Sequence, residues 1–348
     1  MLKTLTLKNF TAFKHAAFSF APNLNVIVGE NGTGKTHLLK LAYSVLYVCG
    51  KENRASSEDD QGNLASHKLI QKFLGVFRVD SLQRLGRRES RPGRCHVKCL
   101  FDFSRQPLEF SFNGSPLGVK IDEKPSERVD KLPVYLPTRE LLTIYPGFVS
   151  LYETSHLPFE ETWRDTCILL GAPLAKGLRE KRIKELLIPL EEAMGGKVES
   201  DEAGRFYLNH DGDLMEMHLV AEGLRKLAMV ARLIMTGALV EKAHLFWDEP
   251  ESNLNPKVIK LVARTILSLC KNGIQVFIAS HSLFLLRELD ILLNYEEFKK
   301  LKAQFIGLHQ GEEGVEVQQG ETIDDIGPID ALQEELSQSD RYLSADAQ

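Results

Sequence analysis

The fold of this chain is decided by the stretch Gly29-Glu30-Asn31-Gly32-Thr33-Gly34-Lys35-Thr36, which matches the pattern G-x-x-x-x-G-K-[ST] at every fixed position. An apolar run precedes it at residues 24–28, and leucine-rich sequence typical of a helix follows at 38–42. A strand, a glycine-rich loop and a helix in this order form the context in which the pattern binds phosphate. The sequence therefore predicts a phosphate-binding loop for a nucleoside triphosphate; a surface turn rich in glycine and threonine is the alternative.

The residue types of the loop predict which group each part of it holds. Glycines let the backbone wrap an anion without Cβ clashes, so that successive N–H groups point inward. The helix that follows offers its positive N-terminal end to the same anion. We expect Lys35 to reach the β- and γ-phosphates and the Thr36 hydroxyl to ligate Mg²⁺. The implied cofactors are ATP and Mg²⁺, and the remaining loop residues expected to bind the nucleotide are Asn31, Gly32, Thr33 and Gly34.

A second motif predicts hydrolysis of the bound nucleotide. Residues 245–249 are an apolar run that ends in Asp248 and Glu249, as expected of a buried parallel strand that carries carboxylates at its C-terminal edge. We expect Asp248 to hold the Mg²⁺ shell and Glu249 to act as the general base that polarises the attacking water. A solvated turn before Pro250 is the alternative interpretation. The pair therefore predicts a Mg²⁺-dependent ATPase.

The composition is that of an ordinary globular protein. The chain has 348 residues, of which 43% are hydrophobic and 26% are charged, which suggests one large or two modest domains. Strand-like sequence begins directly at the first residues, so we expect no signal peptide, and no run of eighteen uncharged apolar residues predicts a membrane span. Five scattered cysteines, an odd number, favour a reducing compartment. We therefore expect a cytoplasmic protein without a membrane partner.

One basic stretch stands out against a net charge of −5. It runs from residue 78 to residue 98 and contains only two acidic residues. A solvated basic loop and a surface that contacts the phosphate backbone of DNA are both open interpretations. The arginines that would contact DNA are Arg84, Arg87, Arg88, Arg91 and Arg94.

The periodicity predicts an α/β protein with a divided core. We expect the ATPase core to comprise residues 1–50 and 215–310, with an inserted segment of strands and helices at 51–214. Heptad repeats are absent, so this insert is expected to be compact and to lack a long coiled coil. The clearest helix is predicted at 224–240. Residues 311–348 form an acidic C-terminal tail, in which a helix either docks on its own domain or receives a partner protein.

The order of motifs resembles that of a known family. After the paired acids, residues 250–256 read Pro-Glu-Ser-Asn-Leu-Asn-Pro, and Ala-Ser-His-Ser follows the next strand at 279–282. With the phosphate loop, this set resembles the ABC-type ATPase heads of SMC, RecF and OLD-like proteins, especially stand-alone bacterial AAA family ATPases of the kind found in phage-defence systems. The resemblance covers residues 1–45 and 218–290. It implies a P-loop NTPase head of ABC type with an N-terminal antiparallel β subdomain and a compact mixed α+β insert.

The resemblance also implies roles for further residues. His281 would be the switch histidine that contacts the γ-phosphate, and Asn253 would lie in the D-loop. The signature segment would be residues 220–224, where Gly223 begins a helix that receives the γ-phosphate held by a second copy. A structural role for His281, and turn formation by Asn253, are the alternatives.

Two positions depart from the family pattern. Ala221 replaces the signature serine, which removes one hydroxyl donor. Arg225 and Lys226 could supply compensating positive charge, or they could lie on a solvated helix surface. No glutamine follows residues 133–136, where the Q-loop is expected, so Arg139 or Glu140 either contacts the metal shell or serves the structure alone.

Three functions follow from this resemblance. The first is an ATP-driven switch, a homodimer or higher homo-oligomer that controls an effector encoded nearby, such as a nuclease or toxin, in phage defence. The second is a RecF-like ATPase that binds DNA during repair or recombination. The third, a self-contained nuclease, is disfavoured because the residues after His281 contain no Asp-x-Asp pair.

Overall fold

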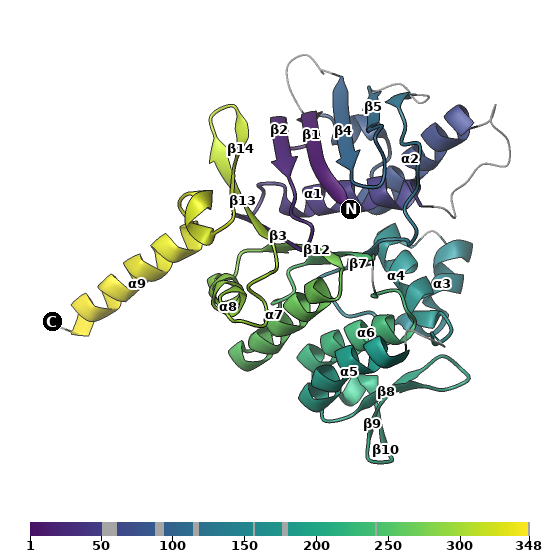
Figure 1. Cartoon of the computed structure of the whole chain (residues 1–348), viewed down its shortest axis with the longest axis vertical. Helices are drawn as coiled ribbons and strands as arrows, with labels where there is room; N and C mark the ends of the chain where they lie inside the picture. The colour runs from purple at the N-terminus through teal and green to yellow at the C-terminus, as the bar shows by residue number, and fades with distance from the viewer. Residues whose placement is uncertain are drawn as a thin grey trace.

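A six-stranded sheet in the order β14-β13-β3-β12-β11-β7 lies at the centre of the computed structural model, which describes residues 1–50, 61–87, 94–113, 118–155, 157–175, 180–240 and 242–346 (Figure 1). Neighbouring strands are parallel except β14, which pairs with β13 as an antiparallel hairpin. The motif-bearing loops after the parallel strands therefore meet at one edge of the sheet. Its strands are β3 (Leu24–Gly29), β7 (Val134–Leu136), β11 (His244–Asp248), β12 (Gln275–Ser280), β13 (Ala303–Gly311) and β14 (Gly314–Gly320).

The central sheet is buried on both faces, because successive side chains of a strand point to opposite sides. In β11, Phe246 joins one hydrophobic cluster, and the adjacent Trp247 joins the other. Both side chains are completely buried. Apolar residues at consecutive positions of 245–247 are thus required by two separate cores.

The first face is covered by helix α1 (Lys35–Val48) and, beyond it, by an antiparallel sheet in the order β2-β1-β4-β5-β6 (Figure 1). Helix α2 (Gln61–Phe77) packs against α1 and carries Phe73 into the same cluster. Phe73 lies edge-on to Phe77 and also contacts the rings of β5. The five strands of this sheet are β1 (Leu2–Phe10), β2 (Phe13–Ser19), β4 (Cys95–Phe101), β5 (Leu108–Phe112) and β6 (Val119–Glu123).

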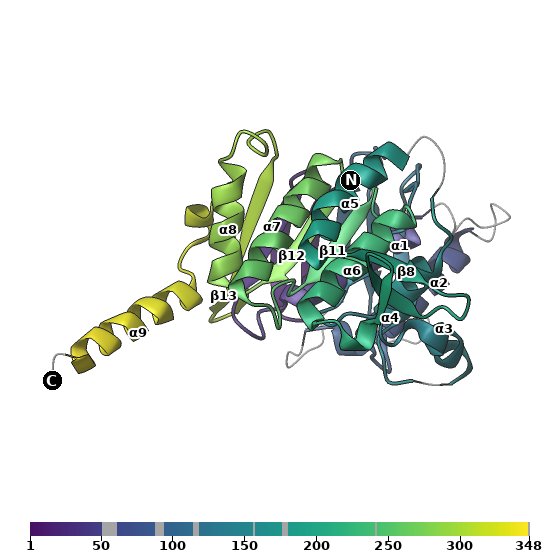
Figure 2. The same ribbon diagram turned by 90° about the horizontal axis from the view of Figure 1, so that it is seen from below.

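Helices cover the second face of the central sheet (Figure 2). Helix α6 (Glu222–Met235), α7 (Pro256–Lys271) and α8 (Leu283–Leu293) place their apolar sides on it. A helical lobe packs beside α6 and carries a three-stranded sheet in the order β10-β9-β8. That lobe contains α3 (Tyr145–Thr154), α4 (Glu161–Gly171), α5 (Glu180–Met194), β8 (Lys197–Ser200), β9 (Phe206–His210) and β10 (Asp213–Glu216).

The structure differs from the sequence-based expectation in two places. Residues 51–214 contribute strands to all three sheets rather than to one insert, because β4 pairs with β1 and β7 pairs with β11. The helix expected at 224–240 begins at Glu222 and ends at Met235. It ends there because Gly237 adopts a φ of 78°, a left-handed conformation that stops a helix.

Of the expected acidic tail at 311–348, residues 314–320 form β14 of the central sheet, and only the last part forms helix α9 (Asp330–Asp346), which projects away from the rest of the molecule (Figure 1). Every side chain from 337 to 344 is exposed, including Tyr342 and Leu343, so this part of the helix does not dock on its own domain. Among the described residues, no helix is long and apolar enough to cross a membrane.

Helix α1 is joined to α2 and α4 by buried charges. Lys72 Nζ on α2 lies 2.6 Å from Glu161 Oε1 and 2.7 Å from Asp165 Oδ2 on α4. The Tyr43 hydroxyl of α1 donates to the same Asp165 oxygen at 2.6 Å, and Lys72 also lies over the ring of Tyr47. The lysine side chain is only 4% exposed, so water cannot replace it as the partner of the two acids.

We predict that Lys72→Met lowers the free energy of unfolding by about 3–5 kcal/mol, because it removes the cation shared by Glu161 and Asp165 and leaves only Arg164, at 3.2 Å from Asp165, to oppose their charge. Denaturant unfolding followed by circular dichroism measures this change. Lys299→Met is the matched control, since its ion pair with Glu296 is exposed and should cost less than about 1 kcal/mol. Equal losses in the two variants would contradict the prediction.

Candidate nucleotide-binding and hydrolysis site

The phosphate loop joins β3 to α1 in the conformation that the motif predicts. Gly32 and Gly34 have φ angles of 85° and 92°, which glycine adopts far more readily than other residues. A Cβ on Gly34 would also lie 3.1 Å from the ring of Phe13, so the close approach of the β1–β2 turn requires glycine there. Lys35 Nζ donates to the carbonyl oxygens of Gly29 and Glu30, at 2.7 and 2.9 Å. The lysine is thereby held over the loop.

Thr36 and Asp248 meet across 212 residues of sequence. The Thr36 hydroxyl donates to Asp248 Oδ1 at 3.2 Å, and the Tyr135 hydroxyl donates to Oδ2 at 3.4 Å. The hydroxyl oxygen of Thr36 and the carboxylate oxygen of Asp248 are of the kind that Mg²⁺ prefers. Mg²⁺ usually takes its other ligands from water and substrate phosphate. Among the described residues, no group of three or more His, Cys, Asp and Glu side chains is placed to hold a metal ion. The two residues fit Mg²⁺.

The surroundings of Asp248 disfavour the ionised form of its carboxyl group. Burial raises the pKa of Asp248 to about 6; the hydrogen bond from Thr36 opposes this shift, and the neighbouring charge of Glu249 adds to it. Burial also lowers the pKa of Lys35, against the attraction of Glu249 and Asp248. The charges of Asp248, Glu249 and Lys35 are therefore gathered in one place. Binding of Mg²⁺ and phosphate would lower the free-energy cost of burying them.

Glu249 stands at the end of β11 in a left-handed conformation, with φ of 45°. Its Oε1 lies 3.4 Å from His281 Nδ1, and its Oε2 accepts a hydrogen bond from the Ser252 hydroxyl at 3.0 Å. The structure thus brings the proposed base and the proposed switch histidine together, on the loops after adjacent strands β11 and β12. A strained backbone at a bulky residue is expected where function requires it.

Glu251 belongs to the site and was missed by the sequence analysis. It is 7% exposed, and its Oε1 accepts hydrogen bonds from the Ser280 hydroxyl and the His281 backbone N–H, at 2.6 and 3.4 Å. It therefore holds the loop that carries His281. Its place two residues after the paired acids was the only signal, and that signal says nothing of burial.

The start of α6 packs against the D-loop of the same chain. Asn253 Nδ2 donates to Glu222 Oε1 at 3.1 Å, and Asn253 itself has φ of 60°. A Cβ on Gly223 would lie 2.9 Å from the Leu254 side chain. The helix start at Gly223 thus packs closely on the loop that carries Asn253, and a side chain at Gly223 would displace Leu254.

The interpretation of Arg225 and Lys226 as residues of a solvated helix surface was wrong, whereas their compensating positive charge stays a prediction. Arg225 Nε lies 3.2 Å from Oε1 of Glu140, which is 8% exposed. Lys226 is completely buried, and its Nζ donates to the Ser252 carbonyl at 2.6 Å. Of the two candidates at the Q-loop position, Arg139 is exposed, whereas Glu140 binds α6.

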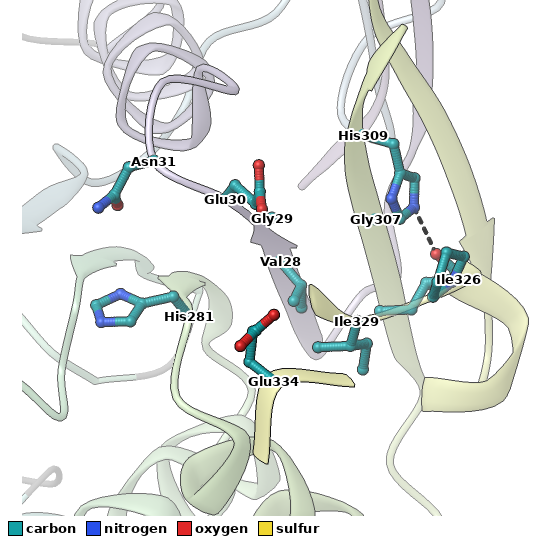
Figure 3. Close-up of a pocket in the computed structure, with 11 residues that line it drawn as sticks. Val28, Gly29, Glu30, Asn31, His281, Gly307, His309, Ile326, Ile329 and Glu334 are labelled. Atoms are coloured by element: carbon teal, nitrogen blue, oxygen red, sulfur yellow. Dashed lines mark hydrogen bonds between the residues drawn. The ribbon is translucent and has the colours of Figure 1, made fainter. Parts of the chain in front are cut away.

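A cavity of about 460 Å³ flanks the first half of the phosphate loop (Figure 3). Asn31 and His281 lie on the same side of it, whereas Ile326 and Ile329 of the C-terminal segment form its far wall. Asn31 and His281 are both exposed. They are therefore accessible to a phosphate or to a second protein molecule.

A second cavity, of about 610 Å³, reaches the loop at Gly32. Gly32 and His37 line it together with Arg78, Arg84 and Arg87. Within the basic stretch, Arg84 and Arg94 are exposed, whereas Arg87 donates to the Ala12 carbonyl at 3.0 Å. Arg88 and Arg91 lie outside the described residues.

Comparison with known proteins gives matches to two family models. Residues 107–287, just over half of the chain, match the family described as "AAA domain, putative AbiEii toxin, Type IV TA system". Residues 4–113 match a family described as "AAA domain". The matches extend over the strands and helices that carry the site.

The curated relatives include DNA replication and repair proteins RecF. That of Desulforamulus reducens is 28% identical over 196 residues, which cover 53% of this chain and 46% of the relative. That of Limosilactobacillus fermentum is 32% identical over 76 residues, which cover 22% of this chain and 19% of the relative. The chain thus spans less than half the length of either relative.

Solved structures of SMC heads share the fold. A Smc head domain bound to the C-terminal domain of ScpA, from Pyrococcus furiosus, has a TM-score of 0.53 and 12% identity, and the match covers 100% of this chain and 99% of that one. A SmcHead bound to the C-winged helix domain of ScpA has a TM-score of 0.52 and 15% identity, with coverage of 93% and 98%. The expected ABC-type head fold is confirmed.

We predict that Asp248→Asn stabilises the nucleotide-free protein at neutral pH. A carboxyl whose pKa rises on folding loses stability as the pH climbs from its unfolded value of about 3.9 towards the folded value of about 6. Asparagine removes this loss, which amounts to about 1–3 kcal/mol. The melting temperature should therefore exceed that of the wild type at pH 7.5, and the difference should shrink at pH 4. A variant less stable than the wild type at pH 7.5 would contradict this.

Proposed function

The chain belongs to the AAA-domain family whose model matches residues 107–287, and we propose that it is a Mg²⁺-dependent ATPase whose ATP-bound form joins two copies. The observation that carries this proposal is the contact of Thr36 with Asp248 at 3.2 Å, beside Glu249 and His281. It joins a phosphate loop, a pair of metal-binding oxygens and a base within one edge of the sheet.

The residues divide the proposed reaction among them. The backbone N–H groups of residues 31–36 and the N-terminal end of α1 bind the β- and γ-phosphates of ATP, and Lys35 moves its contacts from the loop carbonyls to phosphate oxygens. Thr36 and Asp248 would hold Mg²⁺, which neutralises charge on the phosphates when bound. Glu249 accepts a proton from the attacking water, and His281 binds the γ-phosphate and orients Glu249.

The nucleoside is proposed to lie in the cavity of about 610 Å³. That cavity shares Gly32 with the phosphate loop and contains His37 from the first turn of α1, so it continues directly from the place of the phosphates. Arg84 and Arg78 would contact the ribose and phosphate oxygens from the side opposite to the loop.

The site of one copy is incomplete without the other. Asn31 and His281 are exposed and lie on the same side of the cavity beside the phosphate loop, where a second copy could reach them (Figure 3). The start of α6, with Gly223, is an N-terminal helix end that suits an anion. A second copy that docks its α6 there would bind ATP from both sides, so ATP would favour the joined form.

The proposed role is control of an effector protein, in defence against phage. The matched family is described in terms of a putative toxin and a toxin–antitoxin system, which supports a role of this chain in such a system. Helix α9 supports a protein partner, since its described side chains are exposed. Co-purification of the neighbouring gene product with and without ATP would test this role.

We predict that Glu249→Gln traps an ATP-bound dimer, because glutamine keeps the hydrogen-bonding shape but cannot accept the proton. Light scattering in Mg-ATP should show twice the monomer mass for the variant, and phosphate release should fall by at least ~100-fold. Lys35→Ala, which cannot hold the phosphates, is the control and should remain a monomer. A variant that binds ATP without any change in mass would contradict the proposal.

The alternative function, a RecF-like DNA-binding ATPase, is favoured by the RecF relatives and by the exposed Arg84 and Arg94. If it holds, Arg84→Glu with Arg94→Glu should weaken duplex DNA binding more than ~10-fold at low salt and reduce its salt dependence. Fluorescence anisotropy measures both effects.

The charge-matched control for DNA binding is Lys299→Glu with Lys300→Glu, at exposed positions before β13. An equal loss in that control would indicate a general effect of net charge. If the wild type does not bind DNA at low salt, the alternative is wrong.

A further inference from the structure

Lys226 is a lysine without exposure to water. Its side chain lies on α6, four residues from the helix start, and is completely buried. Burial lowers the pKa of Lys226, against the charges of Glu222, Glu251 and Glu249. Burial of an ammonium group is costly unless the group is hydrogen-bonded, whereas methionine would fill similar space without that cost. The hydrogen bond that Lys226 makes therefore indicates why a lysine occupies this position.

That bond leads to the proposed base. Lys226 Nζ donates to the carbonyl oxygen of Ser252 at 2.6 Å, and the hydroxyl of the same Ser252 donates to Glu249 Oε2 at 3.0 Å. The backbone N–H of Ser252 also donates to the Glu249 carbonyl, at 3.1 Å. One residue thus connects the cation of α6 to both the side chain and the backbone of Glu249.

Other contacts also join the helix start to this loop. Glu222 accepts a hydrogen bond from Asn253, and the Leu254 side chain packs so closely on Gly223 that a Cβ there would force it to shift. Glu249 needs such support, since its φ of 45° is unfavourable for a residue with a side chain. Without a fixed loop, its carboxylate would sample other orientations.

We propose that Lys226 is a positioning residue, which fixes the Glu249 carboxylate through Ser252 and transmits the docking of α6 on a second copy to that carboxylate. This rests on the proposed ATPase function. The signature helix then has two tasks in one protein: its first residues meet the ATP of the partner, and Lys226 sets the base for its own ATP. Hydrolysis at one site is thereby coupled to the engagement of the other.

The test compares two buried cations on the same helix. Lys226→Met keeps the volume and removes the donor, so kcat should fall on the order of 10- to 100-fold while the affinity for Mg-ATP stays within ~2-fold. Arg232→Met is the matched control: Arg232 is also buried on α6, but it donates to the carbonyls of Leu170 and Ala172, remote from the loop. It should lose stability and keep kcat. Lys226→Arg should restore part of the rate, because it keeps a donor.

A double-variant cycle separates positioning from structural damage. Ser252→Ala removes the hydroxyl that holds Glu249, so Lys226→Met should reduce kcat little further in that background. Losses that multiply would show that the two residues act independently and would overturn the proposal. An unchanged kcat in Lys226→Met would overturn it as well.

Hydrogen exchange tests the positioning without hydrolysis. In the nucleotide-free protein, Lys226→Met should speed exchange of the Ser252 and Leu254 amides, which are bonded within the loop, and leave α1 and α7 unchanged. Wild-type protection of these amides in the variant would overturn the proposal even if the protein proved inactive on ATP. Faster exchange together with an inactive wild type would uphold the positioning and count against the ATPase function instead.

Discussion

The site depends on one contact, the hydrogen bond from the Thr36 hydroxyl to Asp248. It exists because β3 and β11 flank β12 in a parallel sheet, so their C-terminal ends lie at the same edge. The register of β11 on β12 places Asp248 opposite Ala279, one residue before the strand end at Ser280. A shift of one residue would turn Asp248 to the other face and separate it from the phosphate loop. The apolar residues on both faces of β11 fix that register, and so the two hydrophobic cores hold in place the oxygens that are proposed to bind Mg²⁺.

Strain and buried charge gather around this contact rather than elsewhere in the central sheet. Asp248 is buried beside Glu249, and Glu249 itself has a positive φ. These features oppose stability in the nucleotide-free protein, which is the expected cost of a site preorganised for cations and phosphate. The buried ion cluster around Lys72 has the opposite effect, since it ties α1, the helix behind the phosphate loop, to α2 and α4. The phosphate loop is therefore supported from behind by the ion cluster, whereas the strain lies at Asp248 and Glu249.

The loop after β11 connects every part of the site. Within four residues of this loop, Glu249 contacts His281, and Glu251 accepts a hydrogen bond from the backbone N–H of that histidine. The carbonyl of Ser252 accepts a hydrogen bond from Lys226. Arg225, at the start of the same helix α6, forms an ion pair with Glu140, which lies at the position where a Q-loop is expected. A helix that was read from the sequence as a surface for a partner's phosphate is therefore also attached to two loops of its own site. Such attachment gives the proposed dimer a physical route by which docking affects catalysis.

The sequence by itself determined the phosphate loop, the paired acids, the histidine after β12 and the ABC-type class, because each is a local pattern whose chemistry follows from adjacent residues. It also predicted most of helix α6, where the apolar periodicity is clear. It could not assign β4 to the sheet of β1, or give Glu251, Arg225 and Lys226 their partners, since those contacts join residues between 26 and 99 positions apart. From composition alone, charged residues are expected to be exposed to solvent. Only the tertiary structure decided that these were buried, because burial of a charge depends on a partner that the local sequence does not contain.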